Sequence, residues 1–274
     1  MLARSYRPAV QIEGVGNSVI NSVLSDGNHS AIIFAGNDHI IANNFIARVT
    51  RDVRDSGAIY AGRDWTTYGT VIKNNIFEDI HNILPAPIIR NGLEAYATKG
   101  IYLDDGISGI TIHENVFINT PWAVFINGGK DNDVEHNIFI ESVPPVFASA
   151  LLMYLADRYL SPTWRMQTIL SDLADAKSKL VERHPALWKE RFSLEILKPT
   201  GNTIANNIFL NSGNVAYYKL KDQSYFSAHD NTQLKLNQSQ IEALKAQIDQ
   251  PHISYEAIRS ALCEIVSGCA LRAQ

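Results

Sequence analysis

An internal repeat constrains the fold of this chain more than any other feature of its sequence. Six segments share a turn residue, a β-branched pair, a polar residue, an asparagine and two apolar residues, as in GNDHIIANNFI, YGTVIKNNIF and TGNTIANNIF. Their alignment places six residues at one position: Ser22, Asn44, Asn75, Asn115, Asn137 and Asn207. The intervals of 22, 31, 40, 22 and 70 residues indicate one unit of 22 residues that insertions interrupt.

A second strand-like segment recurs between the asparagine segments, as in AIIFAG, GIYLDD and AVFING. Two or three short strands per coil, stacked about 4.8 Å apart, describe an all-β parallel β-helix, which we predict for residues 1–236. Several coils must stack because one coil cannot bury its apolar face alone. The repeated asparagine is then predicted to form a buried ladder, with amides hydrogen-bonded from coil to coil at a bend.

The longest insertion, residues 150–199, departs from the repeat. Its apolar residues recur mostly at helical spacing between positions 162 and 190. Pro162 suits a helix start, and Pro185 interrupts the pattern. We therefore predict a helical insertion near 162–190 that packs on the side of the stack.

The C-terminal segment, residues 237–274, also reads as helix, in two pieces split by Pro251. We expect it to be a cap or tail, because a helix over the end of a solenoid covers its last edge strand. No comparable segment precedes Tyr6, so we expect an uncovered first coil and an N-terminally truncated fragment. The sequence leaves the oligomeric state open.

Composition excludes several classes of function. Hydrophobic residues make up 46% of the 274 residues and charged residues 19%, which allows a sizeable core. The net charge is −4 and no basic stripe is present, so we expect no nucleic-acid partner. No apolar run approaches the length of a membrane span, and the start lacks the apolar region of a secretory signal peptide.

Metal ligands are scarce in the sequence. The two cysteines, Cys263 and Cys269, cannot supply a C-x-x-C metal site. The eight histidines are scattered, and no pair has ligand spacing with a third partner. We expect no metal or other cofactor, with calcium held by several carboxylates as the alternative.

Side chains alternate between the two faces of the second strand, so residues at equivalent positions of successive coils form columns that face inward or outward in turn. Apolar residues fill the inward columns, which fixes the register. The outward columns place Tyr60 beside Tyr102 on neighbouring coils and Asp104 beside Asn127. Outward aromatic rings can stack on sugar rings, while carboxylate and amide groups bind hydroxyls. The alternative is that the insertions cover these aromatic side chains and make a second core.

Charged residues meet where the second strand ends. Because neighbouring coils are about 5 Å apart, we predict one cluster of four residues at this bend: Arg63, Asp64, Asp104 and Asp105. Trp65 is expected to flank the cluster and to bind substrate. The alternative is an ordinary turn in which an aspartate forms a salt bridge with Arg63, since Asp-Gly is common turn chemistry.

Asp55 is a second-ranked candidate for binding substrate. It lies three residues before its strand, whereas Asp104 lies four residues after the equivalent start. On a straight strand this offset spans roughly 20 Å. A carboxylate pair between them therefore requires a loop that folds back.

The segments YRPAVQIEGVGN, DSGAIYAGRDW, GIYLDDGISGITIHENVF and GGKDNDVEHNIF resemble the bacterial proteins grouped around glycoside hydrolase family 141. The resemblance spans about residues 6–212. It implies a right-handed, single-stranded parallel β-helix of the pectate-lyase-like superfamily, a secreted or periplasmic location, and a polysaccharide or oligosaccharide partner. It also implies that the aspartates of GRDW (Asp64) and YLDD (Asp104 and Asp105) are catalytic.

The leading hypothesis from these observations is a glycoside hydrolase. We predict Asp64 and Asp105 as the acid and base or nucleophile, with Asp104 binding a hydroxyl. One alternative is a polysaccharide lyase or uronate epimerase, for which Arg63 and Lys130 are the nearby cations. The other is a non-catalytic glycan-binding or structural β-helix, or a remnant. It is favoured because the family usually has a His- and Asp-bearing strand where this chain reads PPVFASALLMY.

Overall fold

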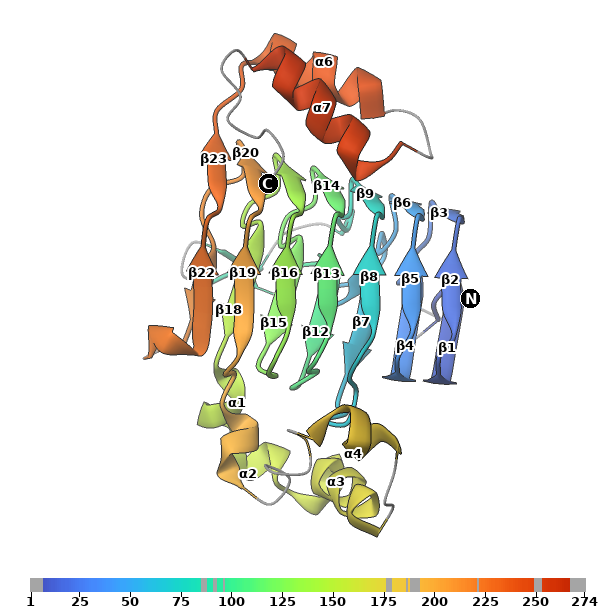
Figure 1. Cartoon of the computed structure of the whole chain (residues 1–274), viewed down its shortest axis with the longest axis vertical. Helices are drawn as coiled ribbons and strands as arrows, with labels where there is room; N and C mark the ends of the chain where they lie inside the picture. Colours follow the sequence, from blue (N-terminus) through green and yellow to red (C-terminus); the bar gives the residue numbers. More distant parts are fainter. Residues whose placement is uncertain are drawn as a thin grey trace.

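The structure, a computed structural model, describes residues 7–84, 88–90, 93–95, 97–175, 179–185, 187, 193–220, 222–248 and 253–266. Its strands form three parallel sheets of seven strands each and one antiparallel pair (Figure 1). The chain visits the three sheets in turn, one strand at a time, so each coil contributes one strand to each sheet. This arrangement fits a parallel β-helix solenoid. Residues 1–6, where the predicted β-helix begins, lie outside the described part.

The strands of each sheet follow one another in chain order. Sheet A contains β1 (Val10–Val15), β4 (Ile32–Asn37), β7 (Gly57–Gly62), β12 (Lys99–Asp104), β15 (Val124–Asn127), β18 (Val146–Ser149) and β21 (Ala216–Tyr218). Sheet B contains β2 (Ser18–Ile20), β5 (Ile40–Ala42), β8 (Val71–Lys73), β13 (Thr111–His113), β16 (Asp133–Glu135), β19 (Asn202–Ala205) and β22 (Phe226–His229). Sheet C contains β3 (Val23–Ser25), β6 (Phe45–Ala47), β9 (Ile76–Glu78), β14 (Val116–Ile118), β17 (Ile138–Ile140), β20 (Ile208–Leu210) and β23 (Thr232–Leu234). The antiparallel pair is β10 (Ile88–Arg90) and β11 (Leu93–Ala95).

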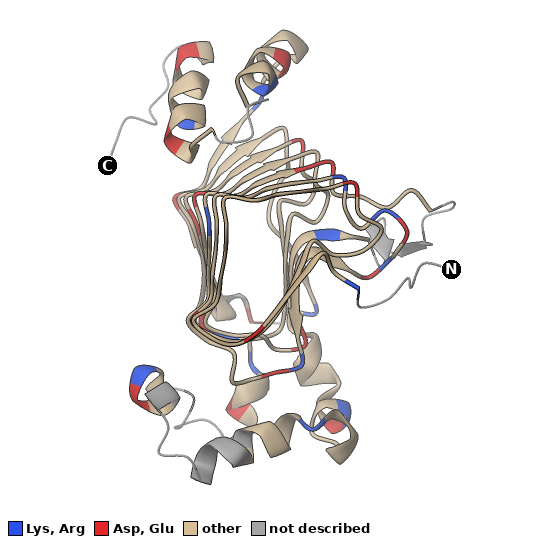
Figure 2. Cartoon of the chain, turned by 90° about the vertical axis from the view of Figure 1, so that its right-hand side faces the viewer, with Lys and Arg blue, Asp and Glu red and all other residues tan. Residues whose placement is uncertain are grey.

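The register of sheet A is the one that the sequence columns predict. Ile101 pairs with Ile59 on one side and with Val124 on the other. Asp104 lies opposite Gly62, and Asn127 lies opposite Ser149. A view along the stack shows the coils superimposed (Figure 2). The predicted columns of sheet A are therefore confirmed.

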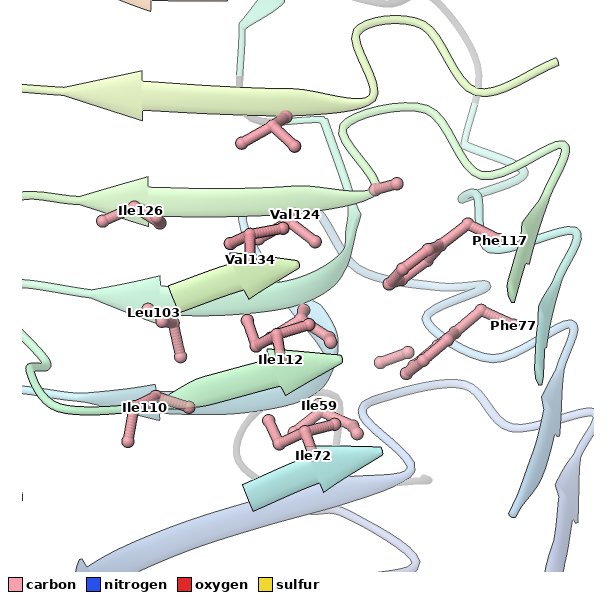
Figure 3. Packing of buried hydrophobic residues seen from close by; sticks show 14 of the residues in the cluster. Ile59, Ile72, Phe77, Leu103, Ile110, Ile112, Phe117, Val124, Ile126 and Val134 are labelled. Atoms are coloured by element: carbon pink, nitrogen blue, oxygen red, sulfur yellow. The ribbon is translucent and has the colours of Figure 1, made fainter. Parts of the chain in front are cut away.

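The interior of the coils is filled by apolar side chains from all three sheets (Figure 3). Phe77, Phe117 and Phe139 stack from coil to coil, with ring centroids 4.6 and 4.8 Å apart. The isoleucines that face them from sheets A and B are fully buried. Burial of one such side chain contributes about 1.5–3 kcal/mol to stability. A single coil cannot bury these side chains alone, so the stabilisation depends on the stacking of neighbouring coils.

The asparagine ladder forms as predicted at the bend between sheets B and C. The Asn75 Nδ2 atom donates to Asn115 Oδ1 at 3.0 Å, and Asn115 Nδ2 donates to Asn137 Oδ1 at 3.0 Å. Each Oδ1 atom also accepts from the backbone N–H of the preceding ladder residue. The ladder continues through Asn207 to Asn231, one coil beyond the last repeat recognised in the sequence.

The longest insertion folds into several short helices at the end of the coils where sheet A turns into sheet B (Figure 1). They are α1 (Leu151–Tyr154), α2 (Ala156–Tyr159), η1 (Pro162–Trp164), α3 (Met166–Asp175), α4 (Lys179–Arg183) and η2 (Leu194–Leu197). Where one helix was predicted, a residue with positive φ, Arg165, separates η1 from α3. Parts of the predicted helix, at 176–178, 186 and 188–190, lie outside the described residues.

The C-terminal segment forms two helices, α6 (Gln238–Ile248) and α7 (Tyr255–Ile265), as the sequence predicts. They pack against apolar residues on the outer face of sheet C, drawn from several coils: Ile76, Val116, Ile138 and Ile208. The two helices therefore lie along the flank of the stack and are not confined to its last edge strand (Figure 1). The predicted segment 267–274 lies outside the described residues, and a short η3 (Gln223–Tyr225) precedes β22.

None of the helices in the described residues has both the length and the apolar character needed to cross a membrane.

Candidate carboxylate site

The bend after sheet A brings Arg63 and Asp105 together. Both residues have a positive φ, 65° and 48°, and they occupy the same position on neighbouring coils. Aspartate tolerates this conformation better than most residues because its short polar side chain can bond locally. Arg63 Nε lies 3.2 Å from Asp105 Oδ2, which confirms the predicted proximity of these two residues.

Asp105 is a buried carboxylate with both oxygens occupied. Its side chain is only 7% exposed, and Oδ1 accepts a hydrogen bond from the Tyr159 hydroxyl at 2.8 Å. Burial and the Asp105 charge raise the pKa of Tyr159 above its ordinary value, so the hydroxyl remains a donor. Asp105 thus ties the bend of the coil to α2.

A second contact joins the same bend to the insertion. The Arg63 guanidinium lies 4.3 Å from the centre of the Trp164 ring, and the Arg158 guanidinium lies 4.5 Å from it. Such cation–π contacts orient both cations. Sequence reasoning missed Tyr159 and Trp164, because nothing in the repeat shows where the insertion returns to the coils.

Trp65 and Asp64 lie at the bend, and the contacts that the structure gives for them are with residues other than Asp104. The Trp65 side chain is 1% exposed and belongs to a cluster with Leu152 and Met166. Asp64 Oδ1 accepts from the backbone N–H of Thr66 at 2.8 Å and from its hydroxyl at 2.6 Å, which is an Asx turn. Within the described chain, Asp64 has no hydrogen bond to Asp104 or Asp105.

Asp104 is the half-buried acid of the site. Its Oδ1 atom accepts from Asn127 Nδ2 at 2.8 Å and from the backbone N–H of Asp105 at 2.9 Å. Its Oδ2 atom accepts from the Tyr60 hydroxyl at 3.1 Å. Burial, followed by the negative charge of Asp105, raises the pKa of Asp104 to about 6, although the hydrogen bonds of Asn127 and Tyr102 act in the opposite direction.

Asp55 comes back toward Asp104 because its loop folds over the outer face of sheet A. Its Oδ1 atom lies 2.8 Å from Lys99 Nζ and 3.4 Å from the Tyr102 hydroxyl. Burial, followed by the negative charges of Asp104 and Asp55, raises the pKa of Tyr102, so the phenol lies near both carboxylates. A straight strand would separate the two positions by roughly 20 Å, and the contact of Asp55 with Tyr102 agrees with the condition drawn from the sequence, a loop that folds back.

Lys99 was not among the predicted site residues. Its side chain is 2% exposed, and Nζ lies 4.1 Å from the centre of the Tyr102 ring. Strict alternation along the strand would have assigned Lys99 to the inward face, with Ile101 and Leu103. A lysine at an inward position was the available signal, because a charge inside an apolar coil requires a partner.

The outward aromatic residues form a small second core, as the alternative interpretation held. Tyr102, Phe125 and Phe147 are 4%, 8% and 4% exposed, and Trp122 packs against the two phenylalanines. Tyr102 and Phe125 stack with ring centroids 5.0 Å apart. Tyr60, in contrast, is half-buried and presents its hydroxyl to Asp104.

One polar atom at the site is unsatisfied. Asn127 is 5% exposed, and its Oδ1 atom is buried without a hydrogen-bond partner in the described structure. The Nδ2 atom of the same amide is the one that donates to Asp104. A buried acceptor without a partner costs about 1–3 kcal/mol, and a hydroxyl from a bound molecule would remove that cost.

The described residues contain no group of three or more His, Cys, Asp or Glu side chains placed to hold a metal ion. Two hollows of about 420 and 260 Å³ lie beside α7 and α6. Neither is lined by Asp55, Asp104 or Asp105. Asp104 and Asp105 lie where sheet A turns toward sheet B, and Asp55 lies just before β7, at the start of its sheet A strand.

Comparisons of the chain with protein-family models, with curated proteins and with solved structures gave no match.

Proposed function

We propose that this chain is a right-handed parallel β-helix that hydrolyses glycosidic bonds in a polysaccharide or oligosaccharide. Right-handedness is supported by the general preference of crossover connections between parallel strands. The observation that carries the function is the half-buried Asp104, with a pKa of about 6, beside a second carboxylate across the Tyr102 hydroxyl. The resemblance to glycoside hydrolase family 141 points to the same segment, YLDD.

In this proposal Asp104 is the general acid. A carboxyl group with a pKa near 6 retains a proton in a substantial fraction of molecules at mildly acidic pH, which an ordinary aspartate does not. Tyr60 and Asn127 hold its two oxygens in a fixed orientation. The proton is then available to a leaving glycosidic oxygen that approaches from the exposed side.

Asp55 is the second carboxylate of the proposed pair. It is 50% exposed and ion-paired with the buried Lys99, which fixes its position. Both carboxylates act on the Tyr102 phenol, Asp55 through a contact of 3.4 Å and Asp104 through its charge, and a pair of nearby carboxylates is what glycosidases use. Asp105 then has a positioning role: its charge raises the pKa of Asp104, and its contacts hold the bend.

These roles differ from those predicted from sequence, and the difference makes a direct test. We expect Asp104→Asn and Asp55→Asn to lose at least about 100-fold in the release of reducing ends from a panel of plant and bacterial polysaccharides. The matched control, Asp64→Asn, keeps its turn oxygen and should retain near-wild-type turnover. Loss of activity in Asp64→Asn alone, with Asp104→Asn active, would refute this assignment and restore the pair predicted from sequence.

The second candidate function is glycan binding without catalysis. It is favoured by the occupied oxygens of Asp105, which accept from Arg63 and Tyr159 and so leave this carboxylate no free atom for catalysis. Retention of a glycan with no new reducing ends would support it. Absorbance from unsaturated uronate products would instead support a lyase.

A further inference from the structure

A groove of about 420 Å³ lies at a different corner of the coil, between the bends that join sheets B and C and the start of α7. Three asparagines from successive coils line one side of it: Asn21, Asn43 and Asn74. The ladder residue Asn44, together with Ile76, Ile253 and Ser254, lines the remainder. Among the described residues that line it, none carries a charged side chain. Its size is that of a small-molecule site.

The amides of these three asparagines are free to bind a ligand. Each residue has a positive φ, between 52° and 56°, and its backbone N–H donates to the next coil. Within the described chain, no hydrogen bond is made by the side chains of Asn21, Asn43 and Asn74. Each amide therefore offers a donor and an acceptor, repeated at the coil spacing of about 4.8 Å.

The three consecutive asparagines at this bend position are confined to the coils that border the groove. The same bend position in the later coils, also at positive φ, is held by Glu114, His136, Asn206 and Asp230. Several residue types therefore satisfy the backbone there, and the left-handed conformation does not by itself require three asparagines. The three amides line the same hollow as Ile253 and Ser254, the two residues before α7.

We propose that this groove is a binding site for a neutral saccharide, separate from the carboxylate site. Amide groups can donate to and accept from neighbouring hydroxyls of one sugar ring, and the aliphatic side chains of Ile76 and Ile253 suit its C–H face. A phosphate or uronate would find no cation to pair with among the described lining residues. The site does not depend on catalysis at Asp104.

The test uses calorimetric titration of the full chain carrying Asp104→Asn, so that no turnover occurs. The probes are two neutral oligosaccharides, cellohexaose and maltohexaose, and a charged one, trigalacturonate. We expect at least one neutral probe to bind and trigalacturonate to bind far more weakly. Failure of both neutral probes to bind at about 10 mM would overturn the proposal, because a weaker interaction has no meaningful affinity.

A pair of matched variants shows whether a probe binds in this groove or at another surface. Asn43→Gly combined with Asn74→Gly keeps the positive φ and removes two amides, so affinity should fall about 10-fold or more. Asn206→Gly makes the same change at the equivalent bend outside the groove and should bind as its parent does. Equal binding by all three proteins would overturn the proposal and assign the binding to another surface, such as the carboxylate site.

Discussion

Replacement of Asp104 by asparagine is expected to stabilise the fold at neutral and alkaline pH. The pKa of this carboxyl group is raised from 3.8 to about 6, which corresponds to a cost of up to about 3 kcal/mol for the ionised side chain in the folded state. Asparagine resembles the protonated acid: its oxygen can accept from Asn127 and from the backbone of Asp105, and its NH₂ group can donate to the Tyr60 hydroxyl. We therefore expect a gain of about 1–3 kcal/mol in the free energy of unfolding.

The pH dependence follows from the direction of the pKa shift. The folded chain binds the Asp104 proton more tightly than the unfolded chain, so the contribution of this residue to stability falls as the pH rises from about 4 to about 6. Above that window the folded state bears the full cost of the ionised Asp104 side chain, and below the window this cost is absent. The advantage of Asp104→Asn should thus be largest at about pH 8 and vanish near pH 4.

Urea unfolding of wild type and variant across this pH range measures the effect directly. Asp64→Asn is the control, because it also removes one charge but keeps the oxygen of its Asx turn, and it should stay within about 0.5 kcal/mol of wild type. A variant Asp104→Asn that is less stable than wild type at about pH 8, with an unaffected control, would show that Asp104 is not strained by burial and by Asp105. A stabilised but inactive variant is the signature expected of a functional residue.

Two further predictions concern the scaffold. Asn115→Ala should cost about 3–5 kcal/mol in urea unfolding, because the buried amide makes five hydrogen bonds, whereas Asn231→Ala at the half-buried end of the ladder should cost clearly less. Equal costs would contradict a cooperative ladder. Tyr159→Phe removes one donor to the buried Asp105 and should cost about 1–3 kcal/mol, measured by thermal unfolding; no loss would mean that α2 is held without this bond.

The repeat made most of the scaffold predictable. Local periodicity determines the ladder position, the register and the inward columns. Each coil contacts only its neighbours, so an alignment of the sequence with itself already orders the residues in space. Asn115 and Ile101 were placed correctly for this reason. The two C-terminal helices were recognised because Pro251 divides two helical patterns.

The candidate site was less predictable, because much of it comes from insertions. The loop before β7 turns Asp55 back over sheet A, and α2 delivers Tyr159 to Asp105. No periodicity governs where such segments return. Lys99 was missed for another reason: at the first residue of its strand, its side chain does not follow the alternation that orders the rest of β12.

The uniform spacing of the asparagine ladder has a consequence for how proteins of this kind can diversify. In every coil two residues separate the sheet B strand from the sheet C strand, and the second of them is the ladder position. The insertions instead enter at the two ends of sheet A: before and after β7, before β12 and after β18. Natural variation or laboratory grafting at those points could change the walls around Asp55 and Asp104 independently of the scaffold. Sheet A would then carry exchangeable loops on a scaffold that the asparagine ladder keeps unchanged.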